Sequence, residues 1–301
     1  MKVLITGADG QLGKEIVTAI QKGECELGTI PEEYKNCEVI SANKQELDIS
    51  NYEKVKLFFQ KHTPNIVINC AAIATADICE EKVEDTFRVN SLGAKNLAVL
   101  SETFNAKLVH ISTDYVFGND GFYSPICELE KCNPVNTYGK SKLLAEEYIK
   151  IFCSKFFIVR TAWLYGKYGK NFVKTIRKLG SEREQLKVIN DQIGSPTSAN
   201  DLVFHILKLA LTEYYGVFHC TNNGSCSWYE FACQIIESSK MKCRVYGCTT
   251  TEYGGKAPRP YYSVLDNMML RNTIGDDMRD WQSALSSYIK LIIEEGENAD
   301  N

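Results

Sequence analysis

The stretch KVLITGADGQLGKEIVTAIQKG, residues 2–23, decides the fold class of this 301-residue chain. Its first part, KVLITG, is an apolar run that ends in glycine, as in a buried strand. Its second part (11–23) carries Leu12, Ile16 and Ile20 at the spacing of an amphipathic helix. A strand that passes directly into a helix is typical of the βα unit of a parallel sheet.

Three glycines join this strand to this helix: Gly7, Gly10 and Gly13, spaced G-x-x-G-x-x-G. Glycine allows a tight turn and a close approach to a pyrophosphate, and the helix start supplies unpaired N–H groups and a positive dipole end. An ordinary turn is the alternative, but the strand–loop–helix context favours a dinucleotide site. Gln11 and Leu12, beside the third glycine, belong to the same expected cofactor contact.

The alternation continues along the first half of the chain. We expect strands at 37–42, 65–72, 107–113 and 155–166, with helices at 51–62, 86–104 and 141–152. Near-continuous apolar strands separated by helices predict an α/β fold, a Rossmann-like doubly wound parallel sheet.

The chain is expected to divide into a dinucleotide-binding domain and a smaller lobe. Residues 1–165 form the first, with elements returning to it from about 195–222, and residues 166–301 form mainly the substrate-binding lobe. The cleft between them is the natural ligand site. Residues 24–37 form a long connection, which we interpret as an exposed insertion and a candidate subunit contact.

Composition excludes several function classes. The net charge is −4 and Lys and Arg form no cluster, which argues against a nucleic-acid surface. The longest apolar run (66–74) is too short to cross a bilayer, and the chain starts in a strand without a signal-peptide pattern. The 12 cysteines show no C-x-x-C spacing and there are only four histidines. We therefore expect free thiols in the cytoplasm, no membrane segment and no metal site.

A reactive pair is indicated by NTYGKSK (136–142), in which Tyr138 and Lys142 share one helical face. The preceding strand delivers Thr113 and Asp114 at its carboxyl end, where parallel sheets bind ligands. A phenol titrates near ~10, and a nearby ammonium is expected to bring the pKa of Tyr138 closer to working pH. Such a tyrosine can give a proton to a carbonyl oxygen that Thr113 holds by a hydrogen bond.

Tyr52 and Lys56 have the same spacing in another setting. Their helix leads into a strand, so we expect them near the amino ends of the strands, away from the ligand edge. A solvated helix pair is the preferred interpretation.

The motifs together resemble the extended short-chain dehydrogenase/reductase family. NCAA (69–72), FRVN (87–90), STDYVF (112–117) and YGKSK (138–142) carry that resemblance with the glycine loop. STDYVFGNDG (112–121), RTAWLYG (160–166), VINDQIGSPT (188–197) and PRP (258–260) are similar to its dTDP-4-dehydrorhamnose reductase branch. The resemblance implies NAD(P)H-dependent reduction of the 4-keto group of dTDP-4-dehydro-L-rhamnose, with a nucleotide-sugar as the partner molecule.

The resemblance also implies roles for individual residues. Tyr138 donates the proton, Lys142 tunes it and binds the nicotinamide ribose, and Thr113 orients the keto oxygen. The remaining implied contacts are Asp48, Ile49, Cys70, Ala71, Ala72 and Asn90 with the cofactor, and Asp114, Trp163 and Arg259 with the substrate. The alternatives are a helix cap for Asn90, a core aromatic for Trp163 and a surface ion pair for Arg259.

Cofactor choice depends on the end of the second strand. Asn43 and Lys44 stand where an acid would grip a ribose hydroxyl. Lys44 would face a 2′-phosphate, with a solvated loop lysine as the alternative, so we expect NADPH with NADH tolerated. The chain departs from the branch where Ile73 and Ala74 follow the double alanine and where Ile78 replaces a common lysine.

Two other functions stay open at this stage. One is a related nucleotide-sugar epimerase or reductase on the same scaffold. The other is a non-catalytic subunit resembling the regulatory subunit of methionine adenosyltransferase. The sequence also leaves a homodimer open.

Overall fold

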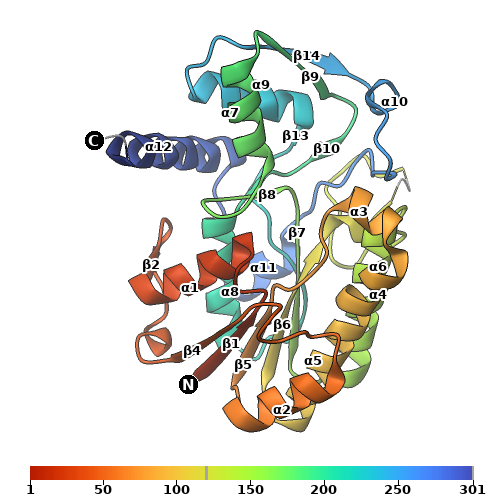
Figure 1. The fold of residues 1–301 in the computed structure, drawn as a ribbon, viewed down its shortest axis with the longest axis vertical. Helices are drawn as coiled ribbons and strands as arrows, with labels where there is room; N and C mark the ends of the chain where they lie inside the picture. Colours follow the sequence, from red (N-terminus) through yellow and green to blue (C-terminus); the bar gives the residue numbers. More distant parts are fainter. Residues whose placement is uncertain (119–120, 300–301) are drawn as a thin grey trace.

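The computed structural model describes residues 1–118 and 121–299, so Asn119 and Asp120 of the STDYVFGNDG motif lie outside the described residues. A parallel sheet of order β12-β7-β6-β5-β1-β4 forms its centre (Figure 1). Its strands are β1 (Lys2–Thr6), β4 (Glu38–Ala42), β5 (Ile66–Asn69), β6 (Lys107–Thr113), β7 (Phe156–Thr161) and β12 (Gly216–His219). The predicted doubly wound α/β class is confirmed.

Helices cover both faces of this sheet (Figure 1). One face carries α1 (Gln11–Lys22) and α8 (Ala199–Leu211), and the other carries α2 (Tyr52–His62), α5 (Gly93–Thr103) and α6 (Thr137–Phe152). The period of two along a strand explains the two cores. Val3 and Ile5 pack on the α1 and α8 side, whereas Leu4 packs on the opposite side.

The helix expected over 86–104 is broken. The structure has α4 (Val83–Phe87), a π-helical turn η2 (Arg88–Leu92) and then α5, after a short α3 (Ala76–Glu81). A π-turn inserts one residue into the helical ladder and is frequent at functional sites. Here it carries Asn90, whose side chain contacts the loop after β5 and helix α6.

A second lobe lies on the side where the strands of the sheet end (Figure 1). Its core gathers aromatic side chains such as Tyr165, Phe231 and Trp281. Its helices are α7 (Phe172–Glu182), α9 (Trp228–Ser238), α10 (Thr250–Tyr253) and α12 (Trp281–Ala299). Its strands pair as β9 (Gln185–Ile189) with β14 (Arg244–Cys248), β10 (Ile193–Gly194) with β13 (Cys226–Ser227), and β8 (Leu164–Tyr165) with β11 (Thr197–Ser198). The strand expected over 155–166 is therefore interrupted, at Trp163, whose φ is 46°.

Most of residues 24–37 are exposed, as expected, but the segment also packs on the fold through Cys25, Ile30 and Tyr34. The segment forms β2 (Glu24–Cys25), β3 (Gly28–Thr29) and the 3₁₀ turn η1 (Glu32–Tyr34). Tyr34 is 1% exposed and donates from its hydroxyl to the Leu207 carbonyl oxygen of α8 at 3.0 Å. Arg279, just before α12, pairs with Glu26 at 3.0 Å. The segment therefore braces α8 against the second lobe.

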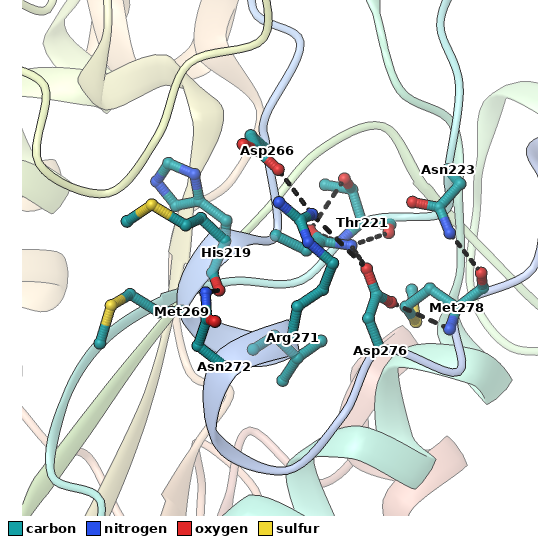
Figure 2. Close-up of polar contacts among 12 residues, drawn as sticks. His219, Thr221, Asn223, Asp266, Met269, Arg271, Asn272, Asp276 and Met278 are labelled. Carbon is teal, nitrogen blue, oxygen red and sulfur yellow. Dashed lines mark hydrogen bonds and ion pairs between the residues drawn. The ribbon is translucent and has the colours of Figure 1, made fainter.

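The chain returns to the edge strand β12 through α11 (Met268–Thr273), as Figure 2 shows. The Asn267 side chain accepts from the Thr221 backbone N–H at 3.0 Å, and Arg271 pairs with Asp266 at 2.6 Å. These contacts fix the segment that crosses from one lobe to the other.

Candidate active site

A cavity of about 490 Å³ opens at the glycine loop. It is lined by Gly7, Asp9, Gly10, Asn43, Lys44, Gln45, Leu47, Asp48, Ile49, Cys70, Ala71, Ala72, Ile73 and Val89. The loops after β1, β4 and β5 supply most of these residues, so the cavity lies at the carboxyl edge of the sheet. The structure therefore brings seven of the predicted cofactor residues together there: Gly7, Gly10, Asp48, Ile49, Cys70, Ala71 and Ala72.

The glycine loop allows this cavity to form beside a helix start. Gly7 has a φ of 63°, and a Cβ on it would lie 2.7 Å from the Ala71 nitrogen. A Cβ on Gly13 would collide with the carbonyl oxygen of Gly7. Gly10 precedes α1 and has no side chain to cap the first N–H groups. These free donors suit the negative charge of a pyrophosphate.

The side chains of Gln11 and Leu12 do not line the cavity. Gln11 donates from Nε2 to the Leu164 carbonyl oxygen at 3.2 Å and accepts from Asn171 at 2.9 Å. Leu12 lies in the hydrophobic core. The cofactor contact expected of these two residues can involve only their backbone N–H groups.

The outer wall of the cavity comes from the loop after β4. Leu47 and Ile49 are buried apolar residues there, and Lys44 is exposed at the rim. Asp48 accepts from the Ser50 hydroxyl at 2.6 Å, which lowers the pKa of its carboxyl group. This wall offers an apolar surface for a base with one ammonium beside it.

The side chains of Tyr138, Thr113 and Asp114 form one hydrogen-bonded series. The Tyr138 hydroxyl is bonded to that of Thr113, and the Thr113 hydroxyl donates to Asp114 at 3.0 Å. Ser263, from the second lobe, donates to the other oxygen of Asp114 at 2.6 Å. Burial raises the pKa of Asp114 to about 6.

The expectation that Lys142 lowers the pKa of Tyr138 is wrong for this structure. Burial raises the pKa of Tyr138, and its hydrogen bond with Thr113 only opposes that rise. Lys142 instead donates to the Ile111 carbonyl oxygen at 2.6 Å and lies 2.9 Å from Nε2 of His110. Burial lowers the pKa of Lys142 to about 8.

Cys70 lies between Lys142 and the cofactor cavity, and its thiol interacts electrostatically with the Lys142 ammonium group. Cys70 lines the cavity, and the Lys142 charge opposes the rise that burial gives to the pKa of its thiol. Lys142 is only 2% exposed. Its ammonium group therefore lies behind the inner wall of the cavity.

Asn90 connects this wall to α6. Its side chain accepts from the Ile73 N–H at 2.8 Å and donates to the Ile73 carbonyl oxygen and to the Ser141 hydroxyl, both at 3.0 Å. It does not cap a helix, which was the alternative interpretation. Asn90 thus joins Ile73, which lines the cavity, to Ser141, which precedes Lys142 on α6.

The predicted substrate contacts Trp163 and Arg259 both have protein partners. Trp163 stacks on Trp228 with ring centroids 3.5 Å apart. Arg259 pairs with Asp77 of α3 at 3.2 Å, and Lys256 pairs with Glu81 of the same helix at 2.6 Å. The loop around PRP (258–260) is therefore attached to α3 by two ion pairs.

Tyr52 and Lys56 are not part of this constellation, although their position differs from the expected one. The loop that carries Asp48 and Ile49 leads into α2, so the helix starts on the ligand side of the sheet. Tyr52 is 40% exposed and does not line the cavity.

Two further features bear on function. Within residues 1–118 and 121–299 no three His, Cys, Asp or Glu side chains gather as a metal site. In the same part of the chain no helix is both long and apolar enough to cross a membrane.

Sequence reasoning missed His110 and Ser263 as neighbours of the reactive residues. His110 interrupts the apolar run KLVHIST, and such a polar residue in a buried strand is the signal that was available. Ser263 gave no comparable signal, because its partner Asp114 is 149 residues away.

Comparisons with known proteins show the family of the chain. The family described as the RmlD substrate binding domain matches residues 1–293. The spore coat polysaccharide biosynthesis protein SpsK of Bacillus subtilis is 39% identical over 289 residues, which are 96% of this chain and 97% of that protein.

Two solved structures have the same fold. A dTDP-4-dehydrorhamnose reductase of Clostridium acetobutylicum is 46% identical with a TM-score of 0.91, and the match covers 97% of this chain and 99% of that one. A Bacillus anthracis dTDP-4-dehydrorhamnose reductase in complex with NADP is 42% identical with a TM-score of 0.88, over 95% and 98% of the two chains. The chain therefore belongs to the RmlD family, the dTDP-4-dehydrorhamnose reductase branch of the extended short-chain dehydrogenases/reductases.

Proposed function

We propose that this protein is an NADPH-dependent reductase of the 4-keto group of dTDP-4-dehydro-L-rhamnose, forming dTDP-L-rhamnose, with NADH tolerated. The observation that carries the proposal is the hydrogen-bonded series Tyr138–Thr113–Asp114 at the carboxyl edge of the same sheet whose glycine loop opens onto a cavity. Family membership supports the substrate class, and the SpsK relative supports a place in cell-surface polysaccharide synthesis.

The cavity residues suit the reduced dinucleotide. The first turn of α1 would hold the pyrophosphate, Leu47 and Ile49 the adenine, and Lys44 the 2′-phosphate. When bound, NADPH supplies the hydride for the keto carbon.

Tyr138 supplies the proton for the keto oxygen. The Tyr138 hydroxyl is protonated at neutral pH and so carries the proton to be donated, although burial, which raises its pKa, also makes it a weaker acid. To orient the keto oxygen, the Thr113 hydroxyl, whose single proton is donated to Asp114, turns that proton toward the substrate. Contact of Lys142 with the nicotinamide ribose requires its Nζ to turn from His110 and the Ile111 carbonyl oxygen toward the cavity. Asp114 with Ser263 holds the Thr113 hydroxyl before the substrate binds.

The second lobe, mainly residues 166–301, contributes the nucleotide-sugar contacts in this proposal, with Trp163 and Arg259 at its inner edge. Binding of a nucleotide phosphate by Arg259 requires exchange of its ion pair with Asp77. The twelve free cysteines support a reducing cytoplasm as the location. Light scattering at several protein concentrations tests the homodimer that the sequence left open.

The test supplies dTDP-4-dehydro-L-rhamnose with NADPH and follows oxidation of the cofactor and appearance of the 4-hydroxy sugar. The proposal predicts stoichiometric oxidation. Sugar turnover without net oxidation would instead indicate an epimerase. Absence of turnover, with co-purification of a synthetase, would indicate a non-catalytic subunit.

A further inference from the structure

A row of polar side chains crosses the sheet beneath the cofactor cavity. Thr6 of β1, Asn69 of β5 and His110 of β6 are register partners on three adjacent strands. All three are at most 2% exposed. Because partners in register point to the same face of a sheet, the row faces α6, where Lys142 completes it.

The hydrogen bonds of this row have fixed directions at one end. The Asn69 oxygen accepts from the Thr6 hydroxyl at 2.7 Å and from the Ala71 backbone N–H at 3.2 Å. A backbone N–H can only donate, so the amide nitrogen of Asn69 faces His110, at 2.9 Å from Nδ1. The Nδ1 atom is therefore the acceptor of this contact.

The proton of the neutral imidazole then resides on Nε2. That atom lies 2.9 Å from the Lys142 Nζ. An N–H that points at Nζ requires a lone pair there, so this arrangement matches Lys142 as a neutral amine. The amine still has N–H groups to donate, one of them to the Ile111 carbonyl oxygen at 2.6 Å.

Protonation of Lys142 reverses the donor and acceptor roles along the row of hydrogen bonds. An ammonium must donate to Nε2, which places the imidazole proton on Nδ1. The Asn69 amide must then turn its oxygen toward His110, and the Ala71 N–H loses its acceptor. Ala71 lines the cofactor cavity, so the charge of Lys142 is linked to the backbone of the cavity wall.

We propose that His110 is the positioning residue of Lys142, holding Nζ through Nε2 and tying the lysine's proton to the hydrogen bonds of Asn69 and Ala71. The inference rests on the proposed function only in assigning Lys142 to the cofactor side of the site.

The other charged groups around Lys142 do not replace this link. Glu146, one turn further along α6, attracts the ammonium but is held by Arg160 at 2.6 Å and by the Ser112 hydroxyl at 2.5 Å. Cys70, at the end of β5, faces Lys142 with a thiol whose pKa burial raises to about 12. Glu146 is thus already engaged by an ion pair, and Cys70 stays a thiol across the range in which Lys142 titrates, because burial lowers the pKa of Lys142 to about 8.

The first test reads the imidazole directly. Nitrogen NMR of the full chain with labelled histidine follows the His110 ring as pH crosses the Lys142 titration, with His110→Gln used for assignment. The proposal predicts the Nε2–H tautomer above the titration and the Nδ1–H tautomer below it. One unchanged tautomer across the range would overturn it. Because no turnover is measured, this result stands even if the proposed function fails.

The second test measures the titration midpoint of Lys142 from the carbon NMR signal of its labelled ε-methylene. In His110→Gln the side-chain amide can offer its oxygen to the ammonium without involving Asn69. The midpoint should rise by about one pH unit or more, the scale of one charge-assisted hydrogen bond. The alkaline limb of kcat/KM should move by the same amount.

His62→Gln, at the end of α2, is the matched control and should leave the Lys142 midpoint in place. An unchanged midpoint in folded His110→Gln would overturn the proposal. Should that variant fail to fold, the His110 signal is assigned by replacing the other three histidines, His62, His205 and His219, and the tautomer measurement decides alone.

Discussion

Replacement of Tyr138 by phenylalanine separates its chemical role from its structural one. The ring stays in place against Tyr115, with ring centroids 5.9 Å apart in the natural chain, and only the hydroxyl is lost. That hydroxyl is hydrogen-bonded to the Thr113 hydroxyl, so the unfolding free energy of Tyr138→Phe should be lower than that of the natural chain by about 1 kcal/mol. Turnover should fall by at least ~10²-fold, the scale of general acid catalysis and about 2.7 kcal/mol of barrier.

The assay compares kcat from NADPH oxidation with NADPH affinity from fluorescence. Tyr52→Phe is the matched control, because Tyr52 has the same spacing to a lysine but is 40% exposed. Tyr138→Phe should bind NADPH normally and turn over slowly, while Tyr52→Phe should match the natural chain in both. Near-normal turnover of Tyr138→Phe, or an equal loss in Tyr52→Phe, would refute the reasoning.

Three further predictions concern cofactor choice, pH and the core. Lys44→Glu should lower the ratio of kcat/KM for NADPH to that for NADH by at least about tenfold, because the rim loses its only cavity-lining ammonium among the described residues; an unchanged ratio would remove Lys44 from the 2′-phosphate site. The raised pKa of Asp114, about 6 against 3.8, adds stability that is present below about pH 4 and lost as pH rises through about 6. Asp114→Asn should therefore flatten the decline of unfolding free energy in urea over that window by up to about 3 kcal/mol, and parallel curves would contradict this. Arg160→Met should lower the unfolding free energy, measured in urea, by about 3–5 kcal/mol, because it leaves Glu146, 0% exposed, without its ion-pair partner. The double variant with Glu146→Leu should lose less stability, and equal losses would contradict the pairing.

Local patterns in the sequence were sufficient to predict the central sheet. The apolar runs and the glycine loop report contacts within one βα unit, and these formed where expected. The same patterns separated Tyr138 from Tyr52, because only the former follows a strand that ends in Thr113. The convergence of Tyr138, Thr113 and Asp114 on one series needed no more than strand order.

Contacts between distant segments could not be predicted in this way. Residues 24–37 read as exposed, yet Tyr34 is buried because α8, 173 residues further along, covers it. The same limit hid the link between Asp114 and Ser263.

The electrostatic surroundings of Lys142 and Tyr138 also could not be predicted from their spacing in the sequence. Spacing placed Lys142 one turn from Tyr138, but its Nζ turns to His110 and the Ile111 carbonyl oxygen. Burial then determines the pKa of Tyr138, a property that depends on the whole core rather than on one neighbour.

Transfer of an isotopic label tests the central claim most directly. The protein is supplied with dTDP-4-dehydro-L-rhamnose and with NADPH that carries deuterium as the transferable hydride, and the product is analysed by NMR and mass spectrometry. The account predicts dTDP-L-rhamnose with one deuterium at C4 for each NADPH oxidised. An unlabelled sugar, a label at another carbon, or no product in the presence of bound NADPH would contradict it.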